Sequence, residues 1–344
     1  MKTVNEKLEQ WAVKKVETEF PDDICLLLEH KTLKLDEDSD KMGLESYVPN
    51  TTRSSGLART FIIDGIGYDL FPQPWETLEK MADADHYNLT SLDDAKIIWA
   101  RNETDRQRFE SLQAKLRANL KNPHLMLARA KNWVNSAAEL FADTLFEDRT
   151  HIIRKNAGYI CDLLAIAVAY TNGVHFHHGQ SGQLTELRKM KTVPSHFIEL
   201  YEKAICEKDP DEQKKICRGL LLTVKDHIKS LTPDVHSRKR SAAELAFWYH
   251  ELSYTWRRIY HFCESGDSIS AFMWGCMLQE ELGQVAEEYD IPEFDILSAY
   301  DAKNLNAFVN QATEAERGIV SAIEADGTKL DVYAGIDEFL EKNP

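Results

Sequence analysis

Long apolar stretches are missing from this chain. No run of about 18 consecutive apolar residues, the length that a membrane-spanning helix needs, occurs among its 344 residues. The opening residues, Met1 to Lys7, are polar and contain no apolar core of the kind found in a signal peptide. These absences predict a soluble, cytoplasmic protein without a membrane partner.

Basic residues are scarce relative to acidic ones. The chain has 41 lysines and arginines against 57 aspartates and glutamates, and its formal net charge is −16. Nucleic-acid phosphates are held by clustered basic side chains, so this balance argues against a nucleic-acid partner. An acidic surface suits a cationic substrate, although it also serves solubility alone.

Residues at the spacing of metal or disulfide sites are also missing. No two cysteines have CxxC spacing, and their surroundings are mostly apolar or helical, so we expect reduced, small core residues. His175, His177 and His178 lie in a glycine-bounded connection without a cysteine or carboxylate at ligand spacing, which does not favour a zinc site. The six cysteines are Cys25, Cys161, Cys206, Cys217, Cys263 and Cys276.

Two acid-bearing segments near the N-terminus are the most informative features present. The cluster Asp36-Glu37-Asp38-Ser39-Asp40 precedes a strand-like run over 43–48, and a second strand-like run over 61–71 carries Asp64 and Asp69. Carboxylates at the ends of neighbouring strands can hold Mg²⁺ against nucleotide phosphates. The acidic run is also typical of a solvated loop. Asp69 lies inside an apolar strand pattern, where a charge must be exposed, paired or metal-bound.

The pattern of elements changes near residue 75. Before it, a helix over 4–19 and a strand over 24–28 precede the two acid-bearing runs. After it, apolar residues recur at helical spacing, with caps at several starts. The sequence therefore predicts an α+β protein, in which a small mixed-sheet N-terminal domain is followed by an all-α helical bundle. We predict the later helices over residues 93–101, 103–120, 123–146, 150–170, 194–206, 211–231, 241–265 and 268–288.

Four segments of the bundle follow one another in a recognisable order: Asp162–Tyr170, His175–His178, Gln183–Arg188 and Val193–Tyr201. With the order of the N-terminal elements, they resemble the nucleotidyltransferase superfamily with a polymerase-β-like core, specifically the kanamycin nucleotidyltransferase type of aminoglycoside-modifying enzyme. The likeness covers roughly residues 1–231. It implies a nucleotidyltransferase-like domain over residues 1–122 and a helical bundle domain over 123–231. Residues 232–344 are expected to form a helical extension, to which the likeness assigns no role.

The family's phosphate-binding turn is altered in this chain. The family places a Gly-Ser pair at the end of the first strand, and Leu28-Glu29-His30 stands there instead. The small residues that let backbone N–H groups and a hydroxyl approach the phosphates are therefore absent. This departure bears directly on whether the chain can carry out the family's reaction.

The family's metal-binding acids are only partly matched. The family has two acids spaced DxD or DxE at the start of the second strand and a third acid on a following strand. Asp40 stands at the first position, and Met42 stands at the second. Asp38 and Asp40 give a DxD one step earlier, and Glu45 follows on the strand, so either could restore a second carboxylate. Asp69 matches the third acid.

The resemblance implies a Mg²⁺-dependent transfer reaction. A nucleoside monophosphate, expected to be AMP, would pass from ATP or another nucleoside triphosphate to a hydroxyl of a small acceptor such as an aminoglycoside, with release of pyrophosphate. Asp38, Asp40 and Asp69 would hold the metal, and Asp69 would count among the catalytic residues.

Other residues receive roles through the same resemblance. Glu139, on the first helix of the bundle, is the candidate general base, although a plain exposed helix acid is an equally good interpretation. Lys155 or Arg154 on the next helix could contact phosphate, although a lone basic residue near a helix start is usually surface charge. Glu29, His30 and Ser39 would line the nucleotide site. Enzymes of the kanamycin type complete their cleft with a second subunit, which implies a homodimer.

The altered motif supports a second hypothesis. Loss of one carboxylate can weaken one of the two metal ions and still leave nucleotide binding possible. The chain would then be a catalytically degenerate nucleotide-binding or protein-interaction member of the same fold.

Overall fold

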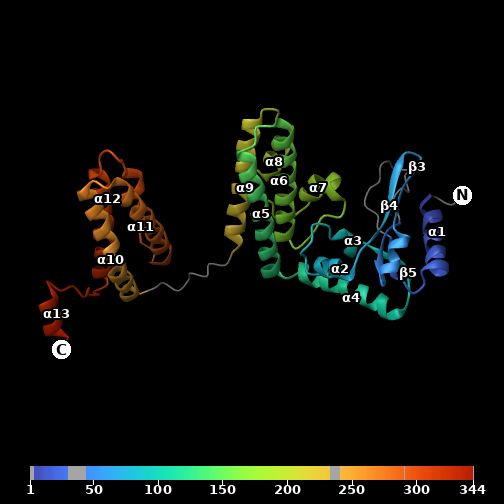
Figure 1. Ribbon diagram of the computed structural model, residues 1–344, viewed down its shortest axis with the longest axis horizontal. Helices are drawn as coiled ribbons and strands as arrows, with labels where there is room; N and C mark the ends of the chain where they lie inside the picture. The colour runs from blue at the N-terminus through green and yellow to red at the C-terminus, as the bar shows by residue number, and fades with distance from the viewer. Residues whose placement is uncertain (1–3, 30–43, 233–240, 290, 344) are drawn as a thin grey trace. The chain divides into compact units, whose positions relative to one another are not determined.

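The chain divides into two compact units, Met1–Thr232 and Pro233–Pro344. The computed structural model describes residues 4–29, 44–232, 241–289 and 291–343 (Figure 1). The first unit contains a five-stranded sheet followed by helices, so the predicted α+β class, with a mixed sheet ahead of a helical bundle, is confirmed. The domain boundary near residue 122 stays a prediction.

The sheet of the first unit has the strand order β3-β4-β2-β1-β5. β2 and β4 run parallel, whereas the other neighbouring strands are antiparallel. β1 has the sequence Ile-Cys-Leu-Leu-Leu-Glu, and such an apolar run suits a strand that is covered on both faces. The strands are β1 (Ile24–Glu29), β2 (Leu44–Pro49), β3 (Arg59–Ile63), β4 (Ile66–Pro72) and β5 (Lys96–Ala100).

The structure changes two sequence-based expectations in the sheet. The run over 61–71 is a β-hairpin, because Asp64 and Gly65 form a two-residue turn with φ angles of 50° and 78°. Residues 93–101 were predicted as a helix, and this prediction is wrong because the segment contains β5. β5 is rich in β-branched and aromatic residues, and its pairing with β1 outweighs the helical spacing.

Helices cover both faces of the sheet. α1 (Val4–Glu19) forms where the sequence predicts it, and Val16 packs in a cluster with Leu27 and Leu70 on one face. On the other face, Leu28 joins a larger core that continues into the helices after β4. The sheet and the bundle therefore share one apolar core.

Helices form most of the rest of the first unit. Two of the predicted helices begin at a side-chain cap. Asn102 accepts a hydrogen bond from the backbone N–H of Asp105 at 2.8 Å, and Asn122 accepts one from that of Leu125 at 3.2 Å. The helices are α2 (Trp75–Ala82), α3 (Thr90–Asp93), α4 (Glu103–Leu120), α5 (Pro123–Leu145), α6 (Thr150–Thr171), α7 (Gly179–Leu187), α8 (Phe197–Cys206) and α9 (Pro210–Leu231), with a 3-10 turn η1 (Thr52–Leu57) after β2.

α6 is the central helix of the bundle. Between Ile160 and Tyr170 its side chains are buried, apart from the half-buried Asp162 and Leu163. A helix that is apolar on all sides must be surrounded by other elements. α5, α8 and α9 pack around α6 and supply that cover (Figure 1).

Neither disulfides nor membrane-spanning helices occur among the described residues. The cysteines are free, and Cys25, Cys161 and Cys217 are buried. Burial raises the pKa of the Cys217 thiol to about 11, which makes it a poor nucleophile. None of the described helices is both long and apolar enough to cross a membrane.

The second unit has its own core. Trp256 is fully buried, and its indole N–H donates to a backbone carbonyl of α12 at 3.0 Å. The buried carboxylate of Glu316 accepts hydrogen bonds from the hydroxyls of Tyr249 at 3.0 Å and Tyr260 at 2.8 Å and pairs with Arg257. These partners compensate the burial of its charge. The helices are α10 (Ala242–Ser265), α11 (Ser268–Tyr289), α12 (Asn306–Ala325) and α13 (Ile336–Lys342), with a 3-10 turn η2 (Leu297–Ala299).

The turn after α6 yields a test of the fold. Gly173 has a φ of 68°, and a Cβ atom there would lie 2.7 Å from the carbonyl oxygen of Leu120. We expect Gly173→Ala to destabilise the first unit by roughly 2 kcal/mol or more, because the side chain adds a steric clash to an unfavourable backbone conformation. The free energy of unfolding, measured with denaturant, checks this.

A matched control lies within α6 itself. A Cβ atom at Gly158 would meet nothing within 4 Å. Gly158 is exposed to solvent and lies well inside the two ends of α6. Gly158→Ala should therefore stabilise the unit by about 0.5–1 kcal/mol. Equal stabilities for the two variants would contradict the conformation assigned to the turn.

Candidate functional site

Two of the predicted site residues, Glu29 and Asp69, belong to the described part of the sheet. Glu29, at the end of β1, pairs with Leu44, the first residue of β2. β4 pairs with β2 in parallel through Ser46 and Phe71, and Asp69 precedes Phe71 by two residues, as Leu44 precedes Ser46. Glu29 and Asp69 therefore lie on β1 and β4, the two strands that flank β2. We call Glu29, Leu44 and Asp69 the acid edge.

The acidic cluster belongs to the segment that joins these strands. Residues 30–43 connect Glu29 to Leu44 along the chain. His30, Asp38, Ser39 and Asp40 fall within it and lie outside the described residues. Their assigned roles stay predictions.

Asp69 is exposed on β4. One carboxylate oxygen accepts a hydrogen bond from the Thr60 hydroxyl across the hairpin at 3.0 Å. The next residue, Leu70, is buried in the core beneath α1, so Asp69 points away from that core. An ionised carboxylate has about four lone-pair positions, and this bond uses one of them. Asp69 can therefore accept a metal ion or a donor group.

The two predicted site residues of the bundle are exposed side chains away from the sheet. Arg129 of α5 pairs with Asp85 at 2.9 Å, and Glu139 lies about ten residues, or about 15 Å, further along this helix. Tyr170 of α6 bonds the backbone carbonyl of His86 at 3.4 Å, and Lys155 lies about 22 Å back along the helix. The assigned roles of Glu139 and Lys155 stay predictions.

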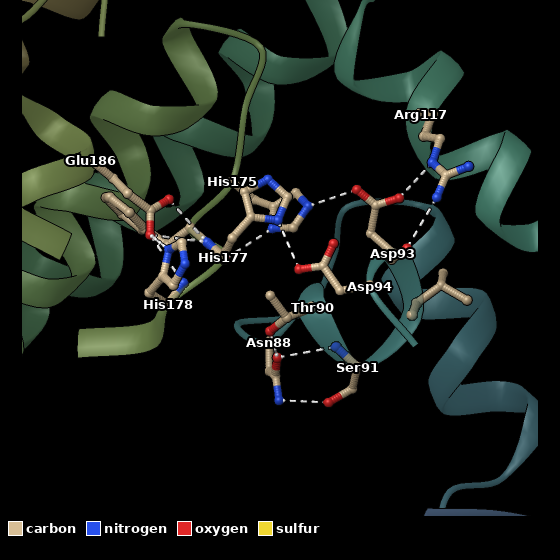
Figure 2. Close-up of polar contacts among 12 residues, drawn as sticks. Asn88, Thr90, Ser91, Asp93, Asp94, Arg117, His175, His177, His178 and Glu186 are labelled. Atoms are coloured by element: carbon tan, nitrogen blue, oxygen red, sulfur yellow. Dashed lines mark hydrogen bonds and ion pairs between the residues drawn. The ribbon is translucent and has the colours of Figure 1, made fainter. Parts of the chain in front are cut away.

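A polar cluster joins the sheet-bearing half to the bundle (Figure 2). We call His175, His177 and His178, with Asp93, Asp94 and Glu186, the histidine junction. Each histidine pairs with one carboxylate: His175 with Asp93 at 3.0 Å, His177 with Asp94 at 2.7 Å and His178 with Glu186 at 2.9 Å. No group of three ligands suited to a metal ion occurs in the part of the chain that the structure describes.

Asp93 is the centre of this junction. Its carboxylate accepts hydrogen bonds from the buried His175 and, at 2.6 Å, from the guanidinium of Arg117 on α4. The hydrogen bond from His175, assisted by Arg117, lowers the pKa of Asp93 to about 2. Asp93 therefore stays ionised at neutral pH and holds α3, α4 and the connection after α6 together.

The sequence did not reveal these pairs, because their members are far apart along the chain. His175 and Asp93 are 82 positions apart, and His177 and Asp94 are 83 apart. The prediction considered only carboxylates at local ligand spacing. The acidic residues that pair with His175 and His177 come from the corner between α3 and β5, which was predicted as a continuous helix.

A cavity of about 290 Å³ lies beside the histidine junction. Its walls come from residues 87–90, the second half of α6 and the start of α7, and Asp162 is its acidic residue. The sequence offered a signal for Asp162, since it is a charge inside the otherwise apolar run of α6. The same argument singled out Asp69.

Comparisons with known proteins find little. No protein-family profile matches the chain, and no curated protein matches it. Among solved structures, a nucleotidyltransferase-like protein from Exiguobacterium sibiricum is similar at 13% sequence identity with a TM-score of 0.35, covering 65% of this chain and 75% of the other. A TM-score of this size carries no argument about activity.

The pairing of His177 yields a prediction about pH. The hydrogen bond to Asp94 raises the pKa of His177 above 6.5, so the pair stabilises the fold fully below pH 6.5 and less as the pH rises through the folded-state pKa. The pair contributes on the order of 0.5 kcal/mol to the free energy of unfolding, because water screens these partly exposed groups. We expect the His177 ring signals in an NMR titration to report the raised pKa.

Two variants test the cause of this shift. Asp94→Asn should lower the pKa of His177 and remove this share of the pH-dependent stability. His124→Asn, which changes an exposed histidine at the start of α5, should leave both unchanged. A His177 titration that is the same in Asp94→Asn and the wild type would show that Asp94 is not responsible.

Proposed function

We propose that the first unit binds a Mg²⁺-bound nucleoside triphosphate at the acid edge and acts as a nucleotidyltransferase. The observation that carries this proposal is the strand order, which places β2 between Glu29 on β1 and Asp69 on β4. The acidic segment joins Glu29 to Leu44 along the chain. The proposal draws no support from the distant structural likeness.

The described donors fit a hard divalent cation. Asp69 is an exposed carboxylate with one hydrogen bond, and Mg²⁺ prefers carboxylate oxygens and water. Asp38 and Asp40 would complete the set of ligands, as the resemblance implies. When bound, the ion neutralises phosphate charge and makes the α-phosphorus more electrophilic.

The proposed reaction transfers a nucleoside monophosphate, AMP if ATP is the donor. A hydroxyl oxygen of a small acceptor, such as an aminoglycoside, forms a bond to the α-phosphorus. The bond from that phosphorus to the bridging oxygen breaks, and pyrophosphate leaves with the electron pair. The hydroxyl proton passes to a carboxylate, for which Glu139 is the proposed residue, and Lys155 is proposed to contact phosphate. A homodimer is part of the proposal, since a second copy could bring the exposed Glu139 to the acid edge.

One observation favours a protein that has lost the transfer reaction. Glu29 lies half-buried at the end of β1, where related enzymes place a Gly-Ser pair. A carboxylate at this position repels phosphate and occupies space that a glycine would leave open. Catalytic degeneracy is therefore the second candidate.

Calorimetric titration tests the acid edge. We expect ATP or another nucleoside triphosphate to bind the full chain only with Mg²⁺, and Asp69→Asn to weaken this binding at least about tenfold because it removes a ligand charge. Asp64→Asn is the matched control, since it removes the same charge at the turn of the same hairpin and asparagine tolerates a positive φ.

Two further outcomes separate the candidates. Release of pyrophosphate in the presence of aminoglycoside acceptors would support transfer, whereas Mg²⁺-dependent binding without release would favour the degenerate protein. Absence of binding by every nucleoside triphosphate, or unchanged binding in Asp69→Asn, would overturn both the transferase and the nucleotide-binding candidate and leave a protein-interaction member of the fold.

A further inference from the structure

The cavity beside the histidine junction contains a carboxylate that is held in place by other side chains. Asp162 on α6 accepts a hydrogen bond from the amide of Gln183 at 2.7 Å, and Gln180 approaches its other oxygen at 3.4 Å. Gln183 is only 2% exposed and lines the cavity with Asp162. Its own oxygen accepts a hydrogen bond from the hydroxyl of the buried Tyr201 at 2.5 Å. Two buried polar groups therefore orient Asp162.

No cationic side chain compensates Asp162 among the described residues. Within the described part of the chain, its hydrogen bonds come from the neutral amides of Gln180 and Gln183, which leave lone pairs of the carboxylate unused. A half-buried charge without a counter-charge costs stability, and a bound cation would offset this cost.

The other polar groups at the cavity are already engaged. Both ring nitrogens of His175 have partners, Asp93 at 3.0 Å and the carbonyl of Phe176 at 3.1 Å. The hydroxyl of Thr90 donates to Asn88 at 2.6 Å, as Figure 2 shows. Asp162 is consequently the charged group with capacity left for a ligand.

The remaining walls suit a small apolar body. Ile166 and Ala169 on α6 and Leu89 opposite them are buried aliphatic side chains that line the cavity. Tyr170 adds a buried aromatic ring, and Tyr87, which is 71% exposed, lies where the lining meets solvent. Aromatic and aliphatic walls around one charged group are typical of sites for compact organic ligands.

We propose that this cavity binds a compact organic cation, with its ammonium group on Asp162 and its apolar part against Ile166 and Ala169. A volume of about 290 Å³ lies at the lower end of the range for ligand pockets and is suited to an aryl or alkyl monoamine. This site is separate from the acid edge and does not depend on the proposed nucleotide chemistry.

Ligand-observed NMR titration with benzylamine tests the charge preference. Benzyl alcohol is the neutral probe of matched size, and benzoate is the probe of opposite charge. The full chain should bind benzylamine at least about tenfold more tightly than benzyl alcohol, because a charge-assisted hydrogen bond forms only with the ammonium group. Benzoate should not bind.

Two variants test the assignment to Asp162. Asp162→Asn keeps the size of the side chain and an acceptor for Gln183, and it should remove the preference for the amine. Gln180→Lys places an ammonium group beside Asp162 from an exposed position and should block benzylamine while the fold is retained. Asp226→Asn, an equal charge change at an exposed site on α9, should bind benzylamine as the wild type does.

Three outcomes of these titrations would contradict the proposed cation site. Equal affinity for benzylamine and benzyl alcohol, unchanged binding in both variants, or no binding of benzylamine up to about 10 mM would overturn it. Asp69→Asn should retain benzylamine binding, so failure at the acid edge and failure at this cavity are distinguishable.

Discussion

The burial of the second half of α6, residues 160–170, is the constraint on which the first unit depends. A helical segment with apolar side chains on all sides cannot lie at a surface, so α5, α8 and α9 pack around α6. Its last turn is covered from the sheet side, where Tyr170 bonds the carbonyl of His86. The chain leaves this helix through Gly173 and then supplies the histidines of the junction. One apolar element thus sets the packing of the bundle and the position of the polar cluster.

Two carboxylates beside this apolar core, those of Asp93 and Asp162, have different kinds of partner. Asp93 is hydrogen-bonded to His175 and paired with Arg117, and its depressed pKa follows from these two partners. Asp162 is oriented by the neutral amides of Gln180 and Gln183. The first arrangement is complete within the protein and holds structure together. The Asp162 carboxylate still has unused lone pairs, and for this reason we propose that it binds a ligand.

Local signals predicted the long helices well, because caps and apolar spacing act within a few residues. β5 escaped prediction, since its partner β1 lies far back in the chain. A charge in an apolar run pointed to Asp69, and the same rule applied to Asp162 would have located the cavity. The pair of His175 and Asp93 had no local signal, because it forms only when α3 meets the end of α6. The roles of residues 30–43 rest on the resemblance.

The strand order also bears on how the chain folds. β1 is the most apolar strand, and it lies between β2 and β5. During synthesis β2 follows soon, whereas β5 emerges only at Lys96. Until then one side of β1 presents unpaired backbone groups beside leucine side chains, which is the kind of edge that promotes aggregation. A ribosome-bound or truncated chain that ends before β5 would therefore depend on chaperones, while the complete unit covers this edge itself.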